Sequence, residues 1–409
     1  MPAQGFGIGA FIDNLIDELG LSRVQLSLAY LIATLMSGLI LPWGGRLLDH
    51  WGARKMILMT AASLGGVLIF LSQTDRLTAQ MNRWLANTSD WGTSFTIILL
   101  GFFALRFLGY GMLPLISNTM MGKWFHHYRG WVMAISGTLI AFSFILGPKL
   151  INELITILGW REAWIAMGTL LIFGMTVLGW LFFRDNPEEC GLVMDGRSFP
   201  EDPPSNSDLI IKKQFTRAEA IRTFAFWAFN LTLSFQSLFL PAYNFHIISI
   251  GSEFGMGPEA ILNLFLPAAG LGVLTSLTIG WLSNHIHMKY VLFVLCIGNG
   301  LVAAGVLSLP SITGCAAVII GLGIANGAFM NLFSLIWPRF FGRQHLGAIN
   351  GFFFASISIA NALGPFLFGL CKQYLGSYRI CFVACTLVAL ILALLSLFAD
   401  NPQRRLPES

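Results

Sequence analysis

The chain has 409 residues, of which 56% are hydrophobic and only 11% are charged, and its formal net charge is +4. Soluble globular domains contain about 25% charged residues, so this composition excludes that class and predicts an all-α polytopic membrane protein. The small, scattered excess of positive charge gives no indication of a nucleic-acid partner. The lipid bilayer and a small-molecule substrate are therefore the expected partners.

The first predicted helix is short. Only about a dozen residues precede the acidic residues Asp13, Asp17 and Glu18, whereas a spanning helix needs about 20 apolar residues. We therefore expect the first helix to be truncated, with a start upstream of Met1. A short but genuine first helix is the alternative.

Eleven further apolar segments predict eleven more spans, about twelve in total. They lie at about residues 26–47, 56–73, 95–119, 132–151, 164–183, 224–249, 260–281, 290–309, 312–337, 347–370 and 380–398. We expect two pseudo-symmetric six-helix bundles at residues 1–184 and 223–400. The linker lies at 185–222 and the tail at 401–409.

The loop charges predict the orientation. Sixteen lysine and arginine residues fall on the side of residues 44–55, and seven fall on the other side. Because positive loops stay inside, we expect both termini and the linker in the cytoplasm, and a multi-pass protein of a bacterial inner membrane. We expect a monomer.

A charged stretch, GGRLLDHWGARK, joins the first two of these eleven spans. We expect it to form a tight turn at a membrane surface, in which Gly45 and Gly52 let helix ends approach closely. Asp49 can face the positive N-terminus of a neighbouring helix, and Arg54 and Lys55 can face carbonyl ends or anionic lipid. The alternative is a positive-inside loop with incidental glycines.

This stretch resembles the loop between the second and third helices of major facilitator superfamily transporters. The resemblance implies a gate latch between the two halves of the protein. The halves of this chain echo each other. FRDNP closes the first half at residues 183–187, and FADNP closes the second at residues 398–402. In the second-half copy of the latch, Asn284 replaces the acid.

A Gly-Pro pair also repeats between the halves. Gly147-Pro148 follows Gly130 by seventeen residues, and Gly364-Pro365 follows Gly347 by the same interval. Gly147 and Pro148 close a predicted span and resemble the fifth-helix motif of family exchangers. A simple helix kink is the alternative, because proline frees a backbone carbonyl and glycine permits close packing.

Arg106 is the sharpest candidate for chemistry. It lies about eleven residues into its span, which places it roughly 16 Å deep. No acid in the same span can pair with it, so its guanidinium can hold a substrate carboxylate by bidentate hydrogen bonds. Alternatively it caps carbonyls of the first helix or serves a proton path, since RFLGYG resembles the family's fourth-helix Arg motif. Tyr110 lies one turn on, on the same face.

The second half has a neutral interior, and its candidates are polar but uncharged. The substrate-binding candidates are Gln236, Tyr243 and Asn361. Gln236 and Tyr243 are seven residues apart and share a helix face. Each candidate can equally be a satisfied interhelical hydrogen bond. Because no Asp or Glu lies in the middle of a span, proton coupling through a carboxylate has little support.

Metal, haem and cofactor chemistry have no sequence support. The six cysteines form no metal-spaced pair and lie mostly in apolar runs, where cysteine behaves as a small hydrophobe. The histidines lie mostly at predicted cytoplasmic helix ends. We expect no disulfide, no metal and no cofactor. Since no nucleophile–base constellation appears, we expect no enzyme.

Within the superfamily, three motifs are similar to the oxalate:formate antiporter and monocarboxylate transporter branch. They are WFHHYRG, which contains Arg129, GWR at residues 159–161, and PEECGL at residues 187–192. The resemblance implies a secondary active transporter of a small organic anion, working by alternating access.

Members of that branch bind their anions with cations of the eighth or eleventh helix, and this sequence has none in either predicted span. The resemblance therefore implies a monocarboxylate as the cargo and not a dicarboxylate such as oxalate. The alternatives are efflux of an amphipathic drug-like compound, and a non-transporting membrane sensor or scaffold on a transporter fold.

Overall fold

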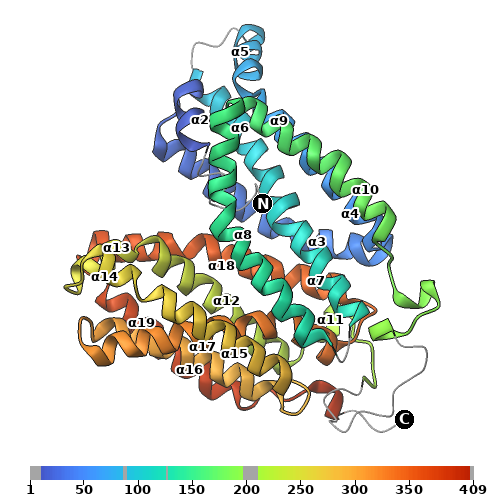
Figure 1. The fold of residues 1–409 in the computed structure, drawn as a ribbon, viewed down its shortest axis with the longest axis vertical. Helices are drawn as coiled ribbons and strands as arrows, with labels where there is room; N and C mark the ends of the chain where they lie inside the picture. Colours follow the sequence, from blue (N-terminus) through green and yellow to red (C-terminus); the bar gives the residue numbers. More distant parts are fainter. Residues whose placement is uncertain (1–10, 86–89, 126–127, 197–210, 406–409) are drawn as a thin grey trace. The chain divides into compact units, whose positions relative to one another are not determined.

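The computed structural model describes residues 11–85, 90–125, 128–196 and 211–405, and all regular elements in these ranges are helices (Figure 1). Nine helical segments among the described residues are long and apolar enough to cross a membrane. Two more long helices, α8 and α12, accompany them with 30 and 22 residues. The prediction of an all-α polytopic membrane protein is confirmed, whereas the predicted truncation falls on residues 1–10, outside the described residues.

The chain forms two compact units. Unit 1 comprises residues 1–120, 139–190 and 350–358, and unit 2 comprises residues 121–138, 191–349 and 359–409. Each unit has a hydrophobic core of its own. The proposed boundaries at residues 184 and 223 stay a prediction.

The first-half helices follow one another with few intervening residues. They are α2 (Ile12–Leu19), α3 (Arg23–Trp51), α4 (Ala53–Ser72), α5 (Thr74–Leu85), α6 (Asp90–Leu105), the π-helix η1 (Arg106–Met112), α7 (Leu113–Trp124), α8 (Arg129–Leu158), α9 (Trp160–Thr169), the π-helix η2 (Leu170–Met175) and α10 (Thr176–Phe182). The core of unit 1 includes Phe11 stacked on Trp164, with ring centroids 4.1 Å apart.

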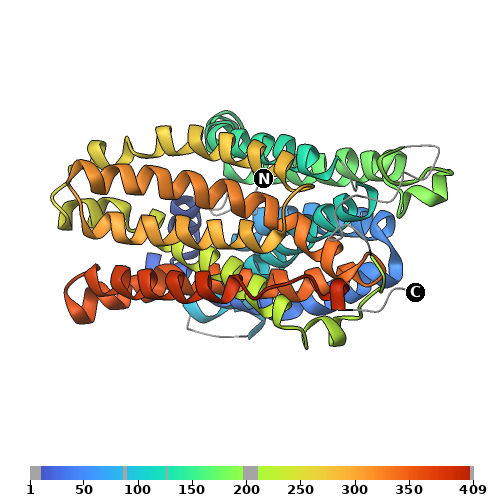
Figure 2. The same cartoon turned by 90° about the horizontal axis from the view of Figure 1, so that it is seen from below.

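The second-half helices are α11 (Arg217–Ala220), α12 (Phe224–Phe245), α13 (Ile247–Glu253), α14 (Pro258–Leu262), α15 (Phe265–Leu282), α16 (Met288–Leu307), α17 (Ile312–Phe341), α18 (Leu346–Leu375) and α19 (Arg379–Ser396). In both views α15, α16 and α17 run side by side as long, apolar helices (Figures 1 and 2). The end of the linker forms the short helix α11, which begins with a capping box between Thr216 and Glu219.

The predicted tight turn at residues 44–55 is wrong over most of its length. α3 continues through residues 44–51 and ends at Trp51, and α4 begins at Ala53. Gly52 alone makes the turn, with a φ of 81° that favours glycine. The earlier glycines serve packing, because a Cβ at Gly44 would collide with the Met112 side chain. Glycine is tolerated in membrane helices where it permits such close approach.

Gly364 of α18 lies directly against α12. A Cβ at this position would fall on the carbonyl oxygen of Leu238, which cannot move without shifting the helix backbone. Gly270 of α15 is the contrasting case, because a Cβ there would meet nothing within 4 Å. The close contact between α12 and α18 therefore depends on glycine at position 364.

Replacing Gly364 by alanine should lower the free energy of unfolding by about 1–3 kcal/mol, since the added methyl must push two helix backbones apart. Gly270→Ala is the matched control, and it should be neutral or stabilising because alanine has the higher helix propensity. Thermal unfolding of the purified variants in one detergent measures both. A Gly364→Ala protein as stable as Gly270→Ala would show that the contact is not tight in solution.

Candidate functional site

Arg106 is buried between two tyrosine rings. Its residue is 2% exposed. The guanidinium carbon lies 3.8 Å from the ring centroid of Tyr110 and 5.1 Å from that of Tyr30. Cation–π contacts of this kind contribute about 2 kcal/mol or more when the pair is desolvated. The guanidinium thus has two aromatic partners, Tyr110 within its own span and Tyr30 on another helix.

The contact between Arg106 and Tyr110 is made on a π-helix. The segment η1 (Arg106–Met112) interrupts an apolar helix that otherwise runs from Gly92 to Trp124. π-Helical turns are rare, and they are frequent at functional sites. The glycines of RFLGYG lower the α-helix propensity of this segment. Together these features make η1 the irregular part of the span and a candidate functional segment.

Tyr30 was missed by sequence reasoning. It lies on α3 and is 76 residues before Arg106 in the sequence. Its ring also packs edge-on against Phe102, with centroids 6.1 Å apart. No local spacing connects α3 to η1, so only the tertiary fold could reveal this partner of the guanidinium.

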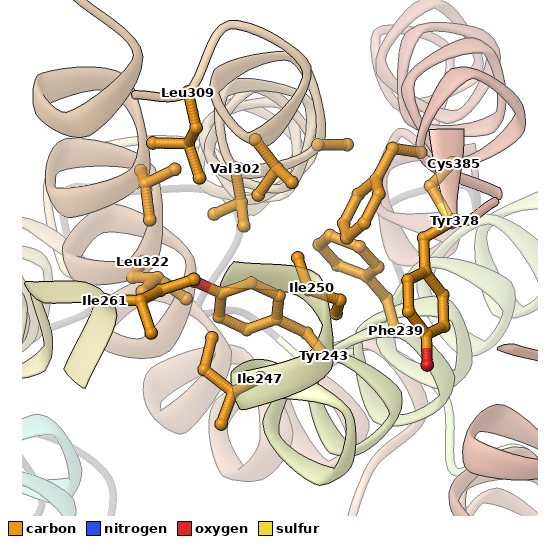
Figure 3. Close-up of a cluster of buried hydrophobic side chains, with 14 of the residues drawn as sticks. Phe239, Tyr243, Ile247, Ile250, Ile261, Val302, Leu309, Leu322, Tyr378 and Cys385 are labelled. Atoms are coloured by element: carbon orange, nitrogen blue, oxygen red, sulfur yellow. The ribbon is translucent and has the colours of Figure 1, made fainter. Parts of the chain in front are cut away.

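The polar candidates of the second half occupy different environments. Gln236 is 2% exposed, and neither its amide nitrogen nor its amide oxygen has a hydrogen-bond partner among the described residues. Tyr243 is fully buried in an apolar cluster with Phe239 and Phe382 (Figure 3). Asn361 is half-buried on α18. The Tyr243 hydroxyl also has no hydrogen-bond partner among the described residues. All three binding roles stay predictions.

An acidic residue, Asp185, lies at the N-terminus of α4, close to the latch segment. The role expected of Asp49 stays a prediction. The backbone N–H of Arg54, in the first turn of α4, donates to the Asp185 carboxylate at 2.7 Å. The guanidinium of Arg54 donates to the carbonyl of Trp180 at 2.8 Å. A Cβ at Gly52 would collide with the same carboxylate. Glycine at the turn therefore makes room for the acid that caps α4.

The second half repeats this arrangement with different groups. Asp400 is the acid of the repeated FADNP motif, and it accepts from the Lys289 ammonium at 2.7 Å. Lys289 lies in the first turn of α16. In both halves, the acid of the closing motif therefore holds the start of an apolar helix. The repeat was visible in the sequence, but its structural purpose was not.

In the second-half copy of the latch, Asn284 is bound by an arginine of α17. Arg339 of α17 is 2% exposed, and it donates to the side-chain oxygen of Asn284 at 2.7 Å and to the carbonyl of Ser283 at 2.6 Å. The amide that replaces the acid is thus a hydrogen-bond acceptor that ties the end of α15 to α17.

The remaining gating candidates lie on two long helices and at the start of α4. Gly45 is buried and Asp49 half-buried on α3, and both Gly52 and Arg54 take part in the contact with Asp185. Lys55 is exposed.

Arg129 begins α8. Gly147 and Pro148 lie inside that helix, which continues to Leu158, so the expectation that they close the span is wrong. α8 tolerates the pair because a membrane helix can satisfy the backbone groups that proline frees by other means.

The opposite ends of the helices carry ion-pair clusters. In unit 1, Arg161 of the GWR motif pairs with Asp75 at 2.6 Å and Glu18 at 3.0 Å. In unit 2, Glu253 accepts from the Lys372 ammonium at 2.5 Å and from the Ser377 hydroxyl at 2.6 Å. Burial acts to raise the pKa of Glu253, but these donors together hold it below its ordinary value.

Replacing Asp185 by asparagine should lower the free energy of unfolding by about 0.5–1 kcal/mol, because the α4 N-terminus loses a charged cap but keeps an acceptor. Asp185→Ala should have a larger effect, since the Arg54 N–H would then lose its partner. Thermal unfolding compares these variants with Glu188→Gln, an exposed acid in the same loop. Equal melting temperatures in all four proteins would contradict the capping role.

Comparison with known proteins identifies what this architecture is similar to. A model of the Major Facilitator Superfamily matches residues 3–365. The hexuronate transporter of Bacillus subtilis (strain 168) is 20% identical over 381 residues, which are 88% of this chain and 82% of that protein.

Two solved structures share the fold. The fucose:proton symporter of E. coli has a TM-score of 0.61 at 15% identity, with 97% of this chain and 96% of that chain covered. A bacterial homologue of the iron transporter ferroportin, in an outward-facing state, has a TM-score of 0.65 at 12% identity, with 96% and 97% covered.

Proposed function

This chain belongs to the Major Facilitator Superfamily, and we propose that it is a secondary active transporter of a small organic anion with one carboxylate. Its family and fold are those of a multi-pass membrane transporter of a small molecule, not of an enzyme. The observation that carries the proposed cargo is the buried cation at Arg106. The proposed transport mechanism of the protein is alternating access.

The packing of Arg106 supports binding of a planar anion. Stacking on Tyr110 and Tyr30 uses the faces of the guanidinium, whereas a carboxylate binds its edge through parallel N–H donors. The two kinds of contact are compatible in geometry. The tyrosine rings also restrict the rotation of the side chain, so less conformational entropy is lost when an anion binds. Arg106 and Tyr110 are therefore the proposed carboxylate site.

The likeness to a hexuronate transporter fits the same charge requirement. A hexuronate is a sugar acid, which carries a single carboxylate together with several hydroxyl groups. The proposed cargo class is therefore a monocarboxylate, with a sugar acid as its first member to test. Hydroxyl groups need neutral partners, and Gln236, Tyr243 and Asn361 are the proposed ones. Membership of the oxalate:formate antiporter and monocarboxylate transporter branch, and exchange as the mode of transport, belong to the same proposal.

The orientation, the latch and the oligomeric state are further parts of the proposal. The excess of loop lysines and arginines supports cytoplasmic termini in a bacterial inner membrane. The charged start of α4, with Arg54 and Lys55, supports a gating role for the latch segment, and Arg129, Gly147 and Pro148 are proposed gate residues on α8. A monomer of two six-helix bundles, at residues 1–184 and 223–400, is the proposed working unit.

Substitution of Arg106 separates cargo binding from structure. Arg106→Lys keeps the charge but loses the bidentate fork, so binding should weaken by roughly 1–3 kcal/mol. Arg106→Gln should abolish binding of the anion yet leave the protein folded, because a neutral amide is less costly to bury than a cation. Ligand affinity is measured by thermal shift with D-glucuronate and a panel of short monocarboxylates, followed by counterflow with any hit.

Tyr110 provides the matched controls for Arg106. Tyr110→Phe retains the aromatic face, so affinity should stay near that of the unchanged protein, whereas Tyr110→Leu should weaken it. The melting temperature without ligand is recorded for every variant. Normal affinity in Arg106→Gln would end the carboxylate proposal, and a loss of melting temperature with normal affinity would make Arg106 structural.

The latch proposal predicts the effect of Asp49→Asn. If the Asp49 carboxylate stabilises the closed cytoplasmic gate, its loss should favour the inward-open state by about 1–2 kcal/mol. Cysteines introduced into α3 should then react faster with an impermeant maleimide from the cytoplasmic side. The measurement needs a Cys190→Ser background, because Cys190 is free and exposed.

His50→Gln is the control for the neighbouring position, which is exposed and should not alter labelling. Unchanged labelling and unchanged transport in Asp49→Asn would remove Asp49 from the gate.

A further inference from the structure

One histidine lies apart from the predicted cytoplasmic helix ends. His246 is the C-terminal cap of α12, and it lines an open pocket of about 730 Å³. The pocket walls also include Ser249, Glu253 and Lys372. The half-buried imidazole can therefore exchange protons with water.

Both ring nitrogens of His246 are engaged. Nε2 lies 3.0 Å from the carbonyl oxygen of Pro365, on α18. Nδ1 lies 3.1 Å from the hydroxyl of Tyr378, which lies immediately before α19. In the close-up of the core, the Tyr378 hydroxyl points away from the apolar cluster (Figure 3). Because the Pro365 carbonyl can only accept, Nε2 must carry a proton for this bond to form.

The Tyr378 hydroxyl can serve two protonation states of the imidazole. In the neutral ring, Nδ1 accepts a hydrogen bond from the hydroxyl. When Nδ1 gains a proton it becomes a donor, and the hydroxyl oxygen must accept. Ser249 Oγ lies 3.3 Å from the same oxygen and offers the displaced hydroxyl proton an acceptor. A proton can thus bind His246 without leaving any group of this cluster unpaired.

The two states differ in how firmly they hold α18. The protonated ring donates a charge-assisted hydrogen bond to Pro365, which is about twice as strong as a neutral one. The neutral ring has an alternative tautomer with its proton on Nδ1, in which the Nε2 lone pair faces the carbonyl oxygen and repels it. The bond lies at the same junction as the contact between Gly364 and Leu238. Proton binding therefore strengthens the contact between α12 and α18.

The charged groups around His246 nearly balance. Lys372 of α18 and Glu253 of α13 line the same pocket and pair with each other. The Lys372 ammonium also lies 5.2 Å from the centre of the Tyr378 ring. Arg379 of α19 is held over Phe254, 5.6 Å from its ring centre. Since the acid and the base of the pocket compensate each other, no net charge of this pair opposes a proton on the imidazole.

We propose that His246 is a reversible proton-binding site, and that its proton strengthens the junction between α12 and α18. Histidine is the side chain that ordinarily changes charge between pH 5 and 8, so this is the pH range in which the site is tested. Proton binding here requires no particular cargo, so its test is independent of the Arg106 test.

The first measurement is a titration of the full chain with ¹³C-labelled histidine in nanodiscs, followed by NMR. The His246 ring signal is assigned as the one missing from His246→Gln, and it should move reversibly between pH 5 and 8. In Tyr378→Phe, the midpoint should move to lower pH because the protonated Nδ1–H loses its acceptor. His285→Gln, an exposed histidine beside Trp281, is the control and should leave the His246 signal unchanged.

The second measurement is hydrogen exchange of the α18 amides at residues 366–372, corrected for the intrinsic effect of pH. Protection should be about five-fold greater at pH 5.5 than at pH 7.5, as expected for a stronger hydrogen bond at the junction. The difference should disappear in His246→Gln and persist in His285→Gln.

A His246 signal that does not move between pH 5 and 8 would overturn the proposal. So would a pH-independent protection of residues 366–372 in the unchanged protein. If His246→Gln does not fold, Tyr378→Phe decides alone, because an unchanged pH dependence of protection in that variant would exclude the hydroxyl exchange on which the proton site depends.

Discussion

A few carboxylates at helix ends hold together helices that the hydrophobic effect cannot sort. Lipid tails are as apolar as the helix surfaces, so burial alone gives little preference for one helix arrangement over another. Asp185 fixes the start of α4, and Asp400 fixes the start of α16 through Lys289. At another helix end, Glu253 accepts hydrogen bonds from Lys372 of α18 and from the backbone N–H of Tyr378, just before α19. Because these contacts lie outside the apolar centres of the helices, each can change without exposing a core.

Two buried arginines, Arg339 and Arg106, have different surroundings. Arg339 is buried but donates to a carbonyl and an amide at a helix end, which makes it a tether. Arg106 is buried to the same degree, and its guanidinium lies over the faces of two aromatic rings. A cation–π contact uses the face of a guanidinium, whereas a carboxylate binds its edge. Cargo binding is therefore proposed for Arg106 and not for Arg339, whose guanidinium donates to groups at a helix end.

Sequence reasoning succeeded where one helix carries the information. The helical class follows from composition, and the contact of Arg106 with Tyr110 follows from spacing along one span. It failed over residues 44–51, because glycine and charge signal a turn in isolation but serve packing and helix ends in a membrane protein.

Partners on different helices were also beyond reach of the sequence. Tyr30 contacts a residue on another helix, and His246 reaches the carbonyl of Pro365, 119 residues away. Neither sequence separation produces a periodic pattern. The repeated motifs therefore indicated which residues matter but not which residues they contact.

The π-helical segment at Arg106 has a consequence for how relatives of this chain should be aligned. A π turn holds one residue more than the α-helical turn that it replaces, and in an α-helix each residue rotates the side chains that follow by about 100°. A homologue that lacks the bulge would be one residue shorter between α6 and α7. An ungapped alignment to such a protein would keep Arg106 in place and shift the assigned face of every later position, including Tyr110. The length of this span is therefore as informative about the proposed carboxylate site as the identity of its residues.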